Sequence, residues 1–391
     1  MSRVLLAWEL GTGFGHLVSL RALALELRKL GHECAFAVRH LASAQEFLEP
    51  GLGPVFQAPV RLGSGRNPVK TQVSYASLLH NVAFDDTNDL AGRIAAWREL
   101  MKVLRITHVC ADHSPLALIA ARTLSVPACY VGSGFTVPPV VTPFPSFRPA
   151  MSIPDKVLAH NEAEVLKELN WALEQLKLPA FEALQDIFSA ARPVLLSYPP
   201  LDHYPIKRPE PFLGMPDYSH GAAPAWPDGN GPKIFAYLRP STALEPTMQA
   251  LAKSRARVLL RLSGAAPAQV KQYLRPGMSV VSSAVSFRLA AESCDFFVNY
   301  GAHSTVCEFL LAGKPGMLVP DLHERVLTSR RAVQMGSCVV ARGKEPAPYV
   351  EAMAKLLQDA SLRGAAERFA KASASINRDA ILPKVAAEFV A

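Results

Sequence analysis

The sequence predicts an α/β protein built from two Rossmann-like halves, and three observations support this prediction. A chain of 391 residues is too long for one ordinary hydrophobic core, so two domains are expected. In both halves short apolar runs alternate with amphipathic helical segments, a pattern typical of parallel βαβ units. PDYSHGAAPAWPDGNGPK, which begins at residue 216 and is rich in proline, glycine and polar residues, separates the two series. We therefore expect an N-terminal domain, a linker, a C-terminal domain and a final helix over residues 1–215, 216–232, 233–375 and 376–391.

The first half opens with a strand, a helix and a second strand. VLLAWEL, from residue 4, is a continuous apolar run of the kind buried on both faces of a parallel sheet. Apolar residues recur at helical spacing from Leu17 to Leu30, and Gly31 then ends the helix. CAFAV predicts the second strand. THVCAD and ACYVGS predict strands on either side of the helix PLALIAARTLSV, and PVLLSYP closes this half.

The second half continues the alternation without repeating the sequence. KIFAYL, RVLLRLS and SVVSS predict strands, and TMQALAKS and APAQVKQYL predict the helices between them. DFFVNYGAHSTVCEFLLAGKPGMLVP, from residue 295, predicts a strand, a glycine turn, a helix and another strand. The chain ends in helical sequence that includes RDAILPKVAAEFVA.

The composition favours a globular protein in a reducing compartment. Half of the residues are hydrophobic, and no apolar run reaches the ~20 residues that span a bilayer. The first apolar stretch leads into a glycine loop and has no signal-peptide layout. The six cysteines show no CxxC spacing and predict small buried residues rather than a metal site. We therefore expect a cytoplasmic protein that binds no metal.

The net charge of +8 suits anionic partners such as nucleotides, phosphates or membrane lipids. A solvated basic surface is the plainer interpretation. No basic run carries interleaved aromatic residues, so we do not expect nucleic acid to bind. Peripheral contact with the inner face of an anionic membrane is compatible with the charge, and no pattern indicates an oligomeric state.

The loop after the first strand, GTGFGH, is close to a dinucleotide-binding fingerprint but departs from it. After Gly11, Gly13 and Gly15, His16 stands where the pattern GxGxxG needs its third glycine. The second strand ends at Arg39 rather than at an acidic residue that could hold a ribose. An imidazole would also stand where the pyrophosphate should lie against bare backbone. We therefore do not expect a dehydrogenase.

His16 and Asp112 form the candidate catalytic pair. A helix N-terminus disfavours the imidazolium, so a neutral His16 can accept a proton from a hydroxyl group. Asp112 ends a strand of the same sheet, where it can fix the tautomer of His16. Gly13, Phe14 and Gly15 then form an acceptor-side loop. The structural alternative is a histidine and an aspartate that merely cap two helices.

A long stretch of the second half carries a family resemblance. VNYGAHSTVCEFLLAGKPGMLVPDLHERVLTSRRAVQMG resembles the donor-binding signature of nucleotide-sugar glycosyltransferases of the GT-B fold. The likeness is closest to the GT1-like family of UDP-glucuronosyltransferases, plant secondary-metabolite glycosyltransferases and macrolide glycosyltransferases. GHLVSLRALALELRKLGHE and the strand ending at Asp112 match the acceptor domain of that family in order and position.

The resemblance implies a GT-B fold, in which two Rossmann-like domains face each other across a cleft and a C-terminal helix is able to cross back to the N-terminal domain. It also implies a bacterial-type, inverting, metal-independent transfer from a UDP- or dTDP-linked sugar to a hydroxyl group, with no cofactor besides that co-substrate. His16 would be the base and Asp112 would orient it. The region 60–100 and the loop TVPPVVTPFPSFRP are apolar with scattered aromatic residues, so we expect a small lipophilic or aromatic acceptor, or a lipid headgroup.

The donor side follows from chemistry and from the resemblance together. Small residues from Gly301 to Thr305 open a helix whose free N–H groups and hydroxyls can hold a diphosphate. The resemblance assigns Glu308 to the ribose hydroxyls, Val285 to the base and the acidic residue of the block around Glu324 to the sugar. The donor-binding residues that we expect are Arg239, Ser241, Thr242, Val285, Tyr300, Gly301, Ala302, His303, Ser304, Thr305, Glu308, His323, Glu324 and Arg325.

Four positions depart from the family pattern. Tyr300 stands where the family has a histidine that contacts the diphosphate, and Ala302 replaces a glycine. Arg325 replaces a glutamine, and Arg239 replaces a glycine. A guanidinium binds phosphate bidentately, so the two arginines can supply the charge that a tyrosine lacks, or Arg325 can pair with an acidic donor sugar. The simpler interpretation is that both arginines are surface residues.

Two other functions stay open on these residues. A nucleotide-sugar epimerase would keep the fold but needs carboxylates around the donor sugar, and the motifs supply few. The departures at Tyr300 and Arg325 are compatible with a non-catalytic protein that binds a nucleotide sugar or activates a partner. A requirement for a separate acceptor argues against the epimerase, and release of nucleotide argues against the pure binder.

Overall fold

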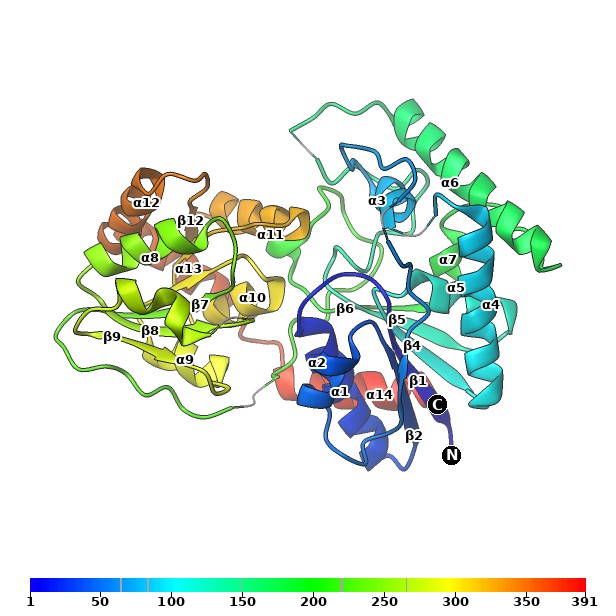
Figure 1. The fold of residues 1–391 in the computed structure, drawn as a ribbon, viewed down its shortest axis with the longest axis horizontal. Coiled ribbons are helices and arrows are strands. Elements are labelled where there is room, and N and C mark those ends of the chain that lie inside the picture. The colour runs from blue at the N-terminus through cyan, green and yellow to red at the C-terminus, as the bar shows by residue number, and fades with distance from the viewer. Residues whose placement is uncertain (64, 83, 149, 219–220, 265) are drawn as a thin grey trace. The chain divides into compact units, whose positions relative to one another are not determined.

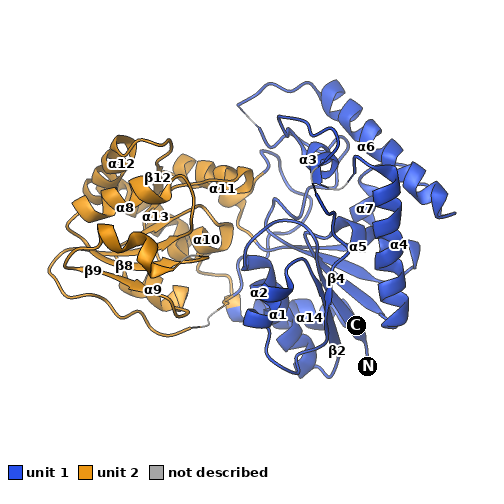
Figure 2. Cartoon of the chain, viewed as in Figure 1, with its two compact units in different colours: residues 1–196, 204–216, 379–391 blue, residues 197–203, 217–378 orange. Residues whose placement is uncertain are grey.

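The computed structural model describes residues 1–63, 65–82, 84–148, 150–218, 221–264 and 266–391. Residues 219–220 of the predicted linker, residues 64 and 83 of the apolar region and residue 149 of the proline-rich loop lie outside the described residues, as does residue 265. The chain forms two compact units, which Figure 2 colours separately. Unit 1 consists of Met1–Leu196, Tyr204–Pro216 and Asp379–Ala391, and unit 2 of Ser197–His203 and Asp217–Arg378.

Unit 1 is built on a parallel six-stranded sheet with the order β3-β2-β1-β4-β5-β6. β1 runs through the middle of the sheet, and its residues from Val4 to Trp8 have no solvent exposure. The apolar run that predicts this strand is thus explained by burial on both faces. The strands are β1 (Arg3–Trp8), β2 (Glu33–Val38), β3 (Val55–Gln57), β4 (His108–Asp112), β5 (Ala128–Gly132) and β6 (Arg192–Leu195).

Helices cover both faces of this sheet (Figure 1). α2 and α14 each pack against α1 on one side, and α3 to α7 form a second group around a core that includes Trp97 and Phe188. The final helix belongs to unit 1, where Glu388 pairs with Arg192 and Phe389 packs on the ring of His108. The helices are α1 (Gly15–Lys29), α2 (Leu41–Phe47), α3 (Tyr75–Val82), α4 (Thr87–Val103), α5 (Pro115–Thr123), α6 (Asp155–Gln175), α7 (Asp186–Ser189) and α14 (Ile381–Val390).

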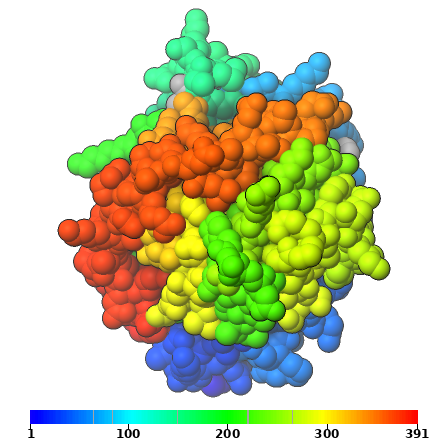
Figure 3. All heavy atoms as spheres, turned by 90° about the vertical axis from the view of Figure 1, so that its left-hand side faces the viewer, coloured from blue at the N-terminus to red at the C-terminus, as the bar shows by residue number. Residues whose placement is uncertain are grey.

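Unit 2 is built on a second parallel six-stranded sheet, with the order β12-β11-β10-β7-β8-β9. Its strands are β7 (Lys233–Leu238), β8 (Arg257–Leu262), β9 (Met278–Val281), β10 (Phe296–Asn299), β11 (Gly316–Leu318) and β12 (Cys338–Val340). Its helices are α8 (Leu244–Lys253), α9 (Phe287–Ser293), α10 (His303–Leu311), α11 (His323–Gln334), α12 (Ala347–Gln358) and α13 (Ala360–Ser373). The 3₁₀ helices are η1 (Pro199–Leu201), η2 (Pro267–Tyr273) and η3 (Arg378–Ala380). η3 begins in unit 2 and ends in unit 1. Figure 3 looks onto this unit, with α12 in orange and residues 221–232 in green on its surface.

Both sheets have the strand order of a doubly wound Rossmann fold. The order reverses between β1 and β4 in unit 1 and between β7 and β10 in unit 2. The register pairs Trp8 with Asp112 and Tyr237 with Asn299, so the loops that follow these strands lie side by side. Ligands of open α/β sheets bind beyond the carboxyl ends of the strands at such a reversal. Each unit therefore has one candidate binding edge.

The predicted fold class is confirmed. Every predicted strand is present, and KIFAYL matches β7 residue for residue. Gly31 has a φ of +82° directly after α1, as a helix-ending glycine requires. The prediction of an α-helix over APAQVKQYL is wrong, because that segment forms the 3₁₀ turn η2. Only Val270 is buried there, so the segment has no apolar face to support an α-helix.

All six cysteines are free and buried, as their apolar surroundings predict. Among the described residues, none of the helices combines the length and the apolarity that crossing a membrane requires.

Candidate active site

His16 and Asp112 form a hydrogen-bonded pair at the carboxyl edge of the unit 1 sheet. His16 is the second residue of α1, and Asp112 is the last residue of β4. Nδ1 of His16 lies 2.8 Å from Oδ1 of Asp112. Because a carboxylate oxygen accepts, Nδ1 carries the hydrogen and Nε2 keeps a lone pair. Asp112 does not cap α5, whose N-cap residue is Ser114, so its carboxylate is available to orient the imidazole.

Neighbouring groups hold the imidazole of His16 in place. The indole of Trp8, at the end of β1, stacks on it with ring centroids 5.2 Å apart. The side chain of His16 is 16% exposed and that of Asp112 is 5% exposed. The carboxylate is thus enclosed, whereas the imidazole keeps contact with solvent.

Gly11 faces the second ring nitrogen of His16. Its φ is +85°, a conformation that favours glycine. A β-carbon at this position would stand 2.7 Å from Nε2 of His16 and 3.5 Å from Nδ1 of His113. The imidazole therefore packs directly against the backbone of Gly11, and a side chain at this position would displace it.

The predicted acceptor-side loop follows Gly11. A β-carbon on Gly13 or Gly15 would meet no atom within 4 Å, so neither glycine is required by close packing. Phe14 is the N-cap residue of α1 and stacks on Phe47 of α2 with ring centroids 4.6 Å apart. The loop is therefore anchored by Phe14 and open at its two glycines.

His113 follows Asp112 in a left-handed backbone conformation, with a φ of +48°. Such a conformation is uncommon for a residue with a side chain and is often found at functional sites. Its carbonyl oxygen accepts a hydrogen bond of 3.0 Å from the N–H of Leu10. Burial, reinforced by the charges of His16 and Arg39, lowers the pKa of His113 to about 3, so this imidazole is neutral at neutral pH.

In unit 2, Asn299 and Gly301 shape the turn between β10 and α10. The side-chain oxygen of Asn299 accepts hydrogen bonds from the N–H groups of Gly301 at 2.7 Å and Ala302 at 2.9 Å. Gly301 has a φ of +86°, and a β-carbon there would stand 2.7 Å from Oγ of Ser329 and 2.9 Å from the carbonyl oxygen of Arg325. Only glycine fits this close approach to α11.

The first turn of α10 presents backbone donors at the same edge. Its N-cap residue is Ala302, which has no side-chain acceptor. The N–H groups of His303, Ser304 and Thr305 therefore have no partner within the helix, and they make an anion-binding end. The ring of His303 is itself buried, with Nε2 3.5 Å from Sγ of Cys307, and burial lowers its pKa to about 4.

Tyr300, Arg239, Arg325 and Asp321 form a charged cluster beside this turn. Oδ1 of Asp321 lies 2.5 Å from Nη1 of Arg325, and Oδ2 lies 3.3 Å from Nε of Arg239. The guanidinium carbons of Arg325 and Arg239 lie 4.5 Å and 5.8 Å from the centre of the Tyr300 ring. The side chain of Arg325 is 7% exposed and that of Arg239 is 30% exposed. Arg239 is therefore the arginine of this cluster that can reach a ligand.

Tyr300 itself is packed into the cluster. Its ring lies 5.3 Å from the ring of Tyr237 on β7. Burial raises the pKa of Tyr300 well above its usual value, and the neighbouring Tyr237 adds to that effect. The phenol thus stays neutral and carries no charge for a phosphate to bind.

Glu308 is held by Arg378. Oε1 of Glu308 accepts a hydrogen bond of 3.1 Å from Nη1, and Oε2 accepts a second from Nη2. The two side chains are 12% and 19% exposed. A ribose that binds Glu308 must share the carboxylate with Arg378 or displace this cation.

The remaining predicted donor residues lie in loops and at a helix start. The carbonyl oxygen of Ser241 accepts from the N–H at the start of α8, and Thr242 is exposed. Val285 forms an isolated bridge with residue 222, and its own N–H and C=O make no hydrogen bond to the described residues. His323 and Glu324 are the first two residues of α11.

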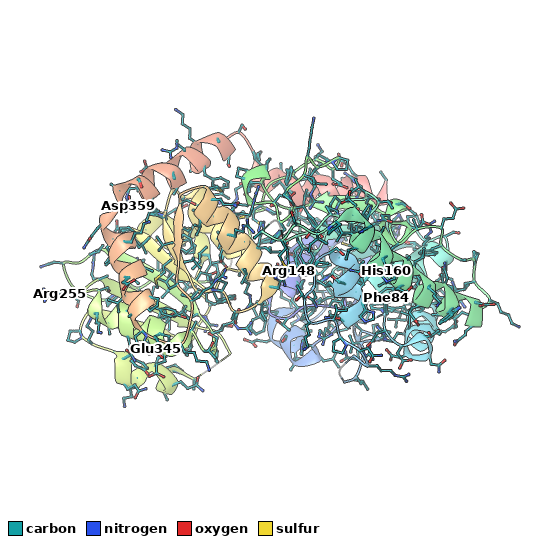
Figure 4. The ribbon with its side chains drawn as sticks, turned by 90° about the horizontal axis from the view of Figure 1, so that it is seen from above. Phe84, Arg148, His160, Arg255, Glu345 and Asp359 are labelled. Carbon is teal, nitrogen blue, oxygen red and sulfur yellow. The ribbon has the colours of Figure 1, made fainter. Side chains whose placement is uncertain are left out.

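A cavity of about 410 Å³ opens in unit 1 beside the proline-rich loop. Arg148, which Figure 4 labels, lines this cavity and donates a hydrogen bond from Nε to the carbonyl oxygen of Gln72. The other lining residues are mostly apolar or uncharged: Thr142, Pro143, Pro145, Ser146, Met151, Ser152, Ile153, Asp155, Leu158 and Pro205. The loop whose composition predicts an acceptor surface supplies five of the eleven residues that line this cavity.

Several residues of these two edges were not predicted from the sequence. Gly11 was one of three similar glycines, and nothing in the spacing separates it from the others. Asp321 and Asn299 each stand at or just after the carboxyl end of a strand, a position that could have marked them. Arg378 lies 70 residues from its partner and has no local signal.

Comparison with known proteins identifies the fold. No protein-family model matches the chain, and no curated protein sequence matches it. Among solved structures, glycosyltransferase VinC in complex with dTDP has a TM-score of 0.66 and 16% identity, with 99% of this chain and 98% of that one covered. The calicheamicin glycosyltransferase CalG4 has a TM-score of 0.68 and 18% identity, covering 100% and 98%. The glycosyltransferase SnogD from Streptomyces nogalater has a TM-score of 0.63 and 18% identity, with 100% of this chain and 99% of that one covered. The chain thus has the GT-B fold over its whole length.

Proposed function

We propose that this chain is an inverting, metal-independent glycosyltransferase. It moves the sugar of a UDP- or dTDP-linked donor to a hydroxyl group of a small lipophilic or aromatic acceptor. The observation that carries the proposal is the His16–Asp112 pair at the reversal of strand order in unit 1, whose imidazole is 16% exposed and so can be reached from solvent. The fold shared with VinC, which was solved with dTDP bound, supports a nucleotide-linked donor.

In this proposal His16 is the general base. Its Nε2 takes the proton of the acceptor hydroxyl while the hydroxyl oxygen attacks C1 of the donor sugar from the face opposite the diphosphate. The new C–O bond forms as the bond from C1 to the diphosphate oxygen breaks, so the configuration at C1 inverts. Asp112, 2.8 Å from Nδ1, stabilises the imidazolium, whose proton then passes to solvent.

Unit 2 binds the donor in this proposal. The backbone N–H groups of Ser304 and Thr305 and the guanidinium of Arg239 face the departing diphosphate and stabilise its charge. Glu308 binds the ribose hydroxyls, and the N–H and C=O of Val285, which make no hydrogen bond to the described residues, bind the base. The N–H groups at the start of α10 and the guanidinium of Arg239 supply the positive potential that a divalent cation supplies in other transferases, so the proposal requires no metal.

Unit 1 binds the acceptor. The cavity beside the proline-rich loop is large enough for a small molecule and is lined by Met151, Ile153, Leu158 and several prolines. Arg148 and Asp155 also line it, so this mixed lining is compatible with a lipophilic acceptor that carries a hydroxyl group.

The test is release of nucleotide from UDP-glucose and dTDP-glucose in the presence of a panel of phenols and lipophilic alcohols, with and without a chelator. We expect acceptor-dependent release that the chelator does not change. H16A should lower kcat by roughly 10²- to 10⁴-fold while it binds the free nucleotide as the wild type does. The matched control is H160A, which removes an exposed histidine of α6 (Figure 4). Full activity in H16A rules out the assigned base.

A non-catalytic nucleotide-sugar binder is the second candidate. The Glu308–Arg378 contact and the neutral, buried Tyr300 favour it, because both leave the donor edge with fewer groups ready for a ligand. Such a protein binds nucleotide but releases none with any acceptor. An epimerase is less well supported, since Asp321 is engaged by two arginines and is a poor base for a carbon-bound proton.

A further inference from the structure

Glu9 is a fully buried carboxylate at the reversal of strand order in unit 1, and the proposed chemistry does not use it. It follows β1 directly and has no solvent exposure. Oε2 accepts hydrogen bonds from the N–H of Leu116 at 3.0 Å and from Oγ of Ser114 at 3.4 Å. Oε1 accepts no hydrogen bond from the described residues, and Nη1 of Arg93 lies 3.7 Å away. Burial of a carboxyl group with one oxygen that accepts no hydrogen bond costs free energy. We therefore expect this side chain to have a structural or functional role.

The contacts of Glu9 join the two loops that carry the catalytic pair. Glu9 begins the loop that leads to His16, and both of its hydrogen-bond donors belong to the start of α5, shortly after Asp112. A second hydrogen bond connects the same loops, from the N–H of Leu10 to the carbonyl oxygen of His113 at 3.0 Å. We refer to these two connections as the loop clamp.

The loop clamp reaches the imidazole through Gly11. This glycine comes two residues after Glu9, and its backbone lies so close to His16 that a β-carbon would stand 2.7 Å from Nε2. Movement of the Glu9 loop relative to α5 therefore moves the imidazole relative to Asp112. Their hydrogen bond of 2.8 Å weakens steeply with a change in distance or angle.

The charges around Glu9 come from three further elements. Arg93 of α4 faces Oε1 and is itself held by Asp89 at 2.7 Å. Arg39, just after β2, donates to the main-chain carbonyl oxygen of Glu9 at 3.0 Å. Tyr75 of α3 is near enough for the carboxylate to raise its pKa further. Burial outweighs the arginines and raises the pKa of Glu9 to about 7.

We infer that Glu9 is a positioning residue, whose carboxyl group fixes the loop carrying His16 against the helix that follows Asp112 and so keeps these two side chains hydrogen-bonded. The expected effect of Glu9 on the transfer rate rests on the proposed function, whereas its effect on the His16–Asp112 hydrogen bond does not.

The structural test is ¹⁵N NMR of the His16 side chain, assigned with H16Q, in E9A, E9D, E9Q and E33Q. We expect E9A and E9D to lose the signature of a fixed Nδ1–H tautomer and to exchange between tautomers. E9Q keeps an oxygen for the N–H of Leu116 and should keep the signature. E33Q is the matched control, because Glu33 pairs with Arg3 at the opposite edge of the same sheet. If E9A does not fold, the spectrum of E9D alone tests the inference. A fixed wild-type tautomer in folded E9A or E9D overturns the inference.

The kinetic test uses the transfer assay on the same variants. We expect E9D to lower kcat by roughly 10- to 100-fold without changing KM for the nucleotide sugar, and E9Q to restore most of the rate. If the wild type transfers no sugar, the proposed function is wrong, and the NMR experiment alone tests the positioning role of Glu9. If E9D has the kcat of the wild type, the positioning role is wrong, and the proposed function is unaffected.

Discussion

Nε2 of His16 lies 2.7 Å from the point at which a β-carbon on Gly11 would stand. Non-bonded carbon and nitrogen atoms do not come this close, so the imidazole packs directly on the backbone of Gly11 and only glycine fits there. Gly11 thus helps to hold the ring of His16 in its position beside Asp112.

G11A should abolish transfer without abolishing folding. The added methyl group clashes with Nε2 and displaces the imidazole from Asp112, so we expect kcat to fall by roughly 10²-fold or more, and the φ of +85° adds a strain of about 1–3 kcal/mol to the folded state. G13A is the matched control, because Gly13 has a similar φ of +102° but open space around its α-carbon. Steady-state kinetics and thermal unfolding of both variants separate displacement of the imidazole from backbone strain. Equal losses of rate in the two would contradict the role given to Gly11.

R239Q should weaken binding of a nucleoside diphosphate more than that of the matching monophosphate. Arg239 is the more exposed of the two cations around Tyr300, and a diphosphate offers its guanidinium more negative charge than a monophosphate does. We expect a loss on the order of tenfold for UDP and little change for UMP, measured by calorimetry. R368Q, which removes an exposed arginine of α13, controls for net charge. Equal effects on both nucleotides would assign Arg239 to the surface.

R378Q should strengthen binding of UDP. Arg378 holds both oxygens of Glu308, so a ribose that binds Glu308 must displace this cation or share the carboxylate with it. Removing the cation should lower Kd for UDP by up to roughly tenfold and should affect dTDP less, since deoxyribose lacks the 2′-hydroxyl. E308Q should weaken UDP in the same titration. Unchanged UDP affinity in both variants would remove Glu308 from the ribose site.

The free energy of unfolding should depend on pH through Glu9. Its pKa is about 7 in the folded protein against 4.5 for an ordinary glutamate, so between these values the folded state binds more protons than the unfolded state. The contribution of Glu9 is therefore fully present below pH 4.5 and is lost as the pH rises through 7. Relative to E9Q, the wild type should lose up to about 3 kcal/mol between pH 4 and 8 in urea unfolding. A pH-independent difference between the two proteins would contradict the buried state of this carboxyl group.

The sequence predicts the strands well because each central strand is buried on both faces and leaves a continuous apolar run. It also predicts the proximity of His16 and Asp112, since both residues stand at the carboxyl ends of neighbouring parallel strands or just beyond them. The roles given to these two side chains remain predictions.

Other contacts depend on the folded chain and could not be predicted in this way. The ion pair of Glu308 with Arg378 joins residues 70 apart, and no periodic pattern marks such a pair. The three glycines of the first loop look equivalent in the sequence, and only the path of the backbone places Gly11, rather than Gly13 or Gly15, against the imidazole. Arg325 likewise could be a ligand or a buried partner of Asp321 until its exposure is known.

The most direct measurement of the central claim is a double-mutant cycle on kcat for acceptor-dependent nucleotide release, with H16A, D112N and the double variant. If Asp112 acts only by orienting His16, its substitution costs nothing once the imidazole is gone. We therefore expect a large loss of kcat in each single variant and a double variant no slower than H16A. Losses that multiply, or a D112N variant as fast as the wild type, would contradict this expectation.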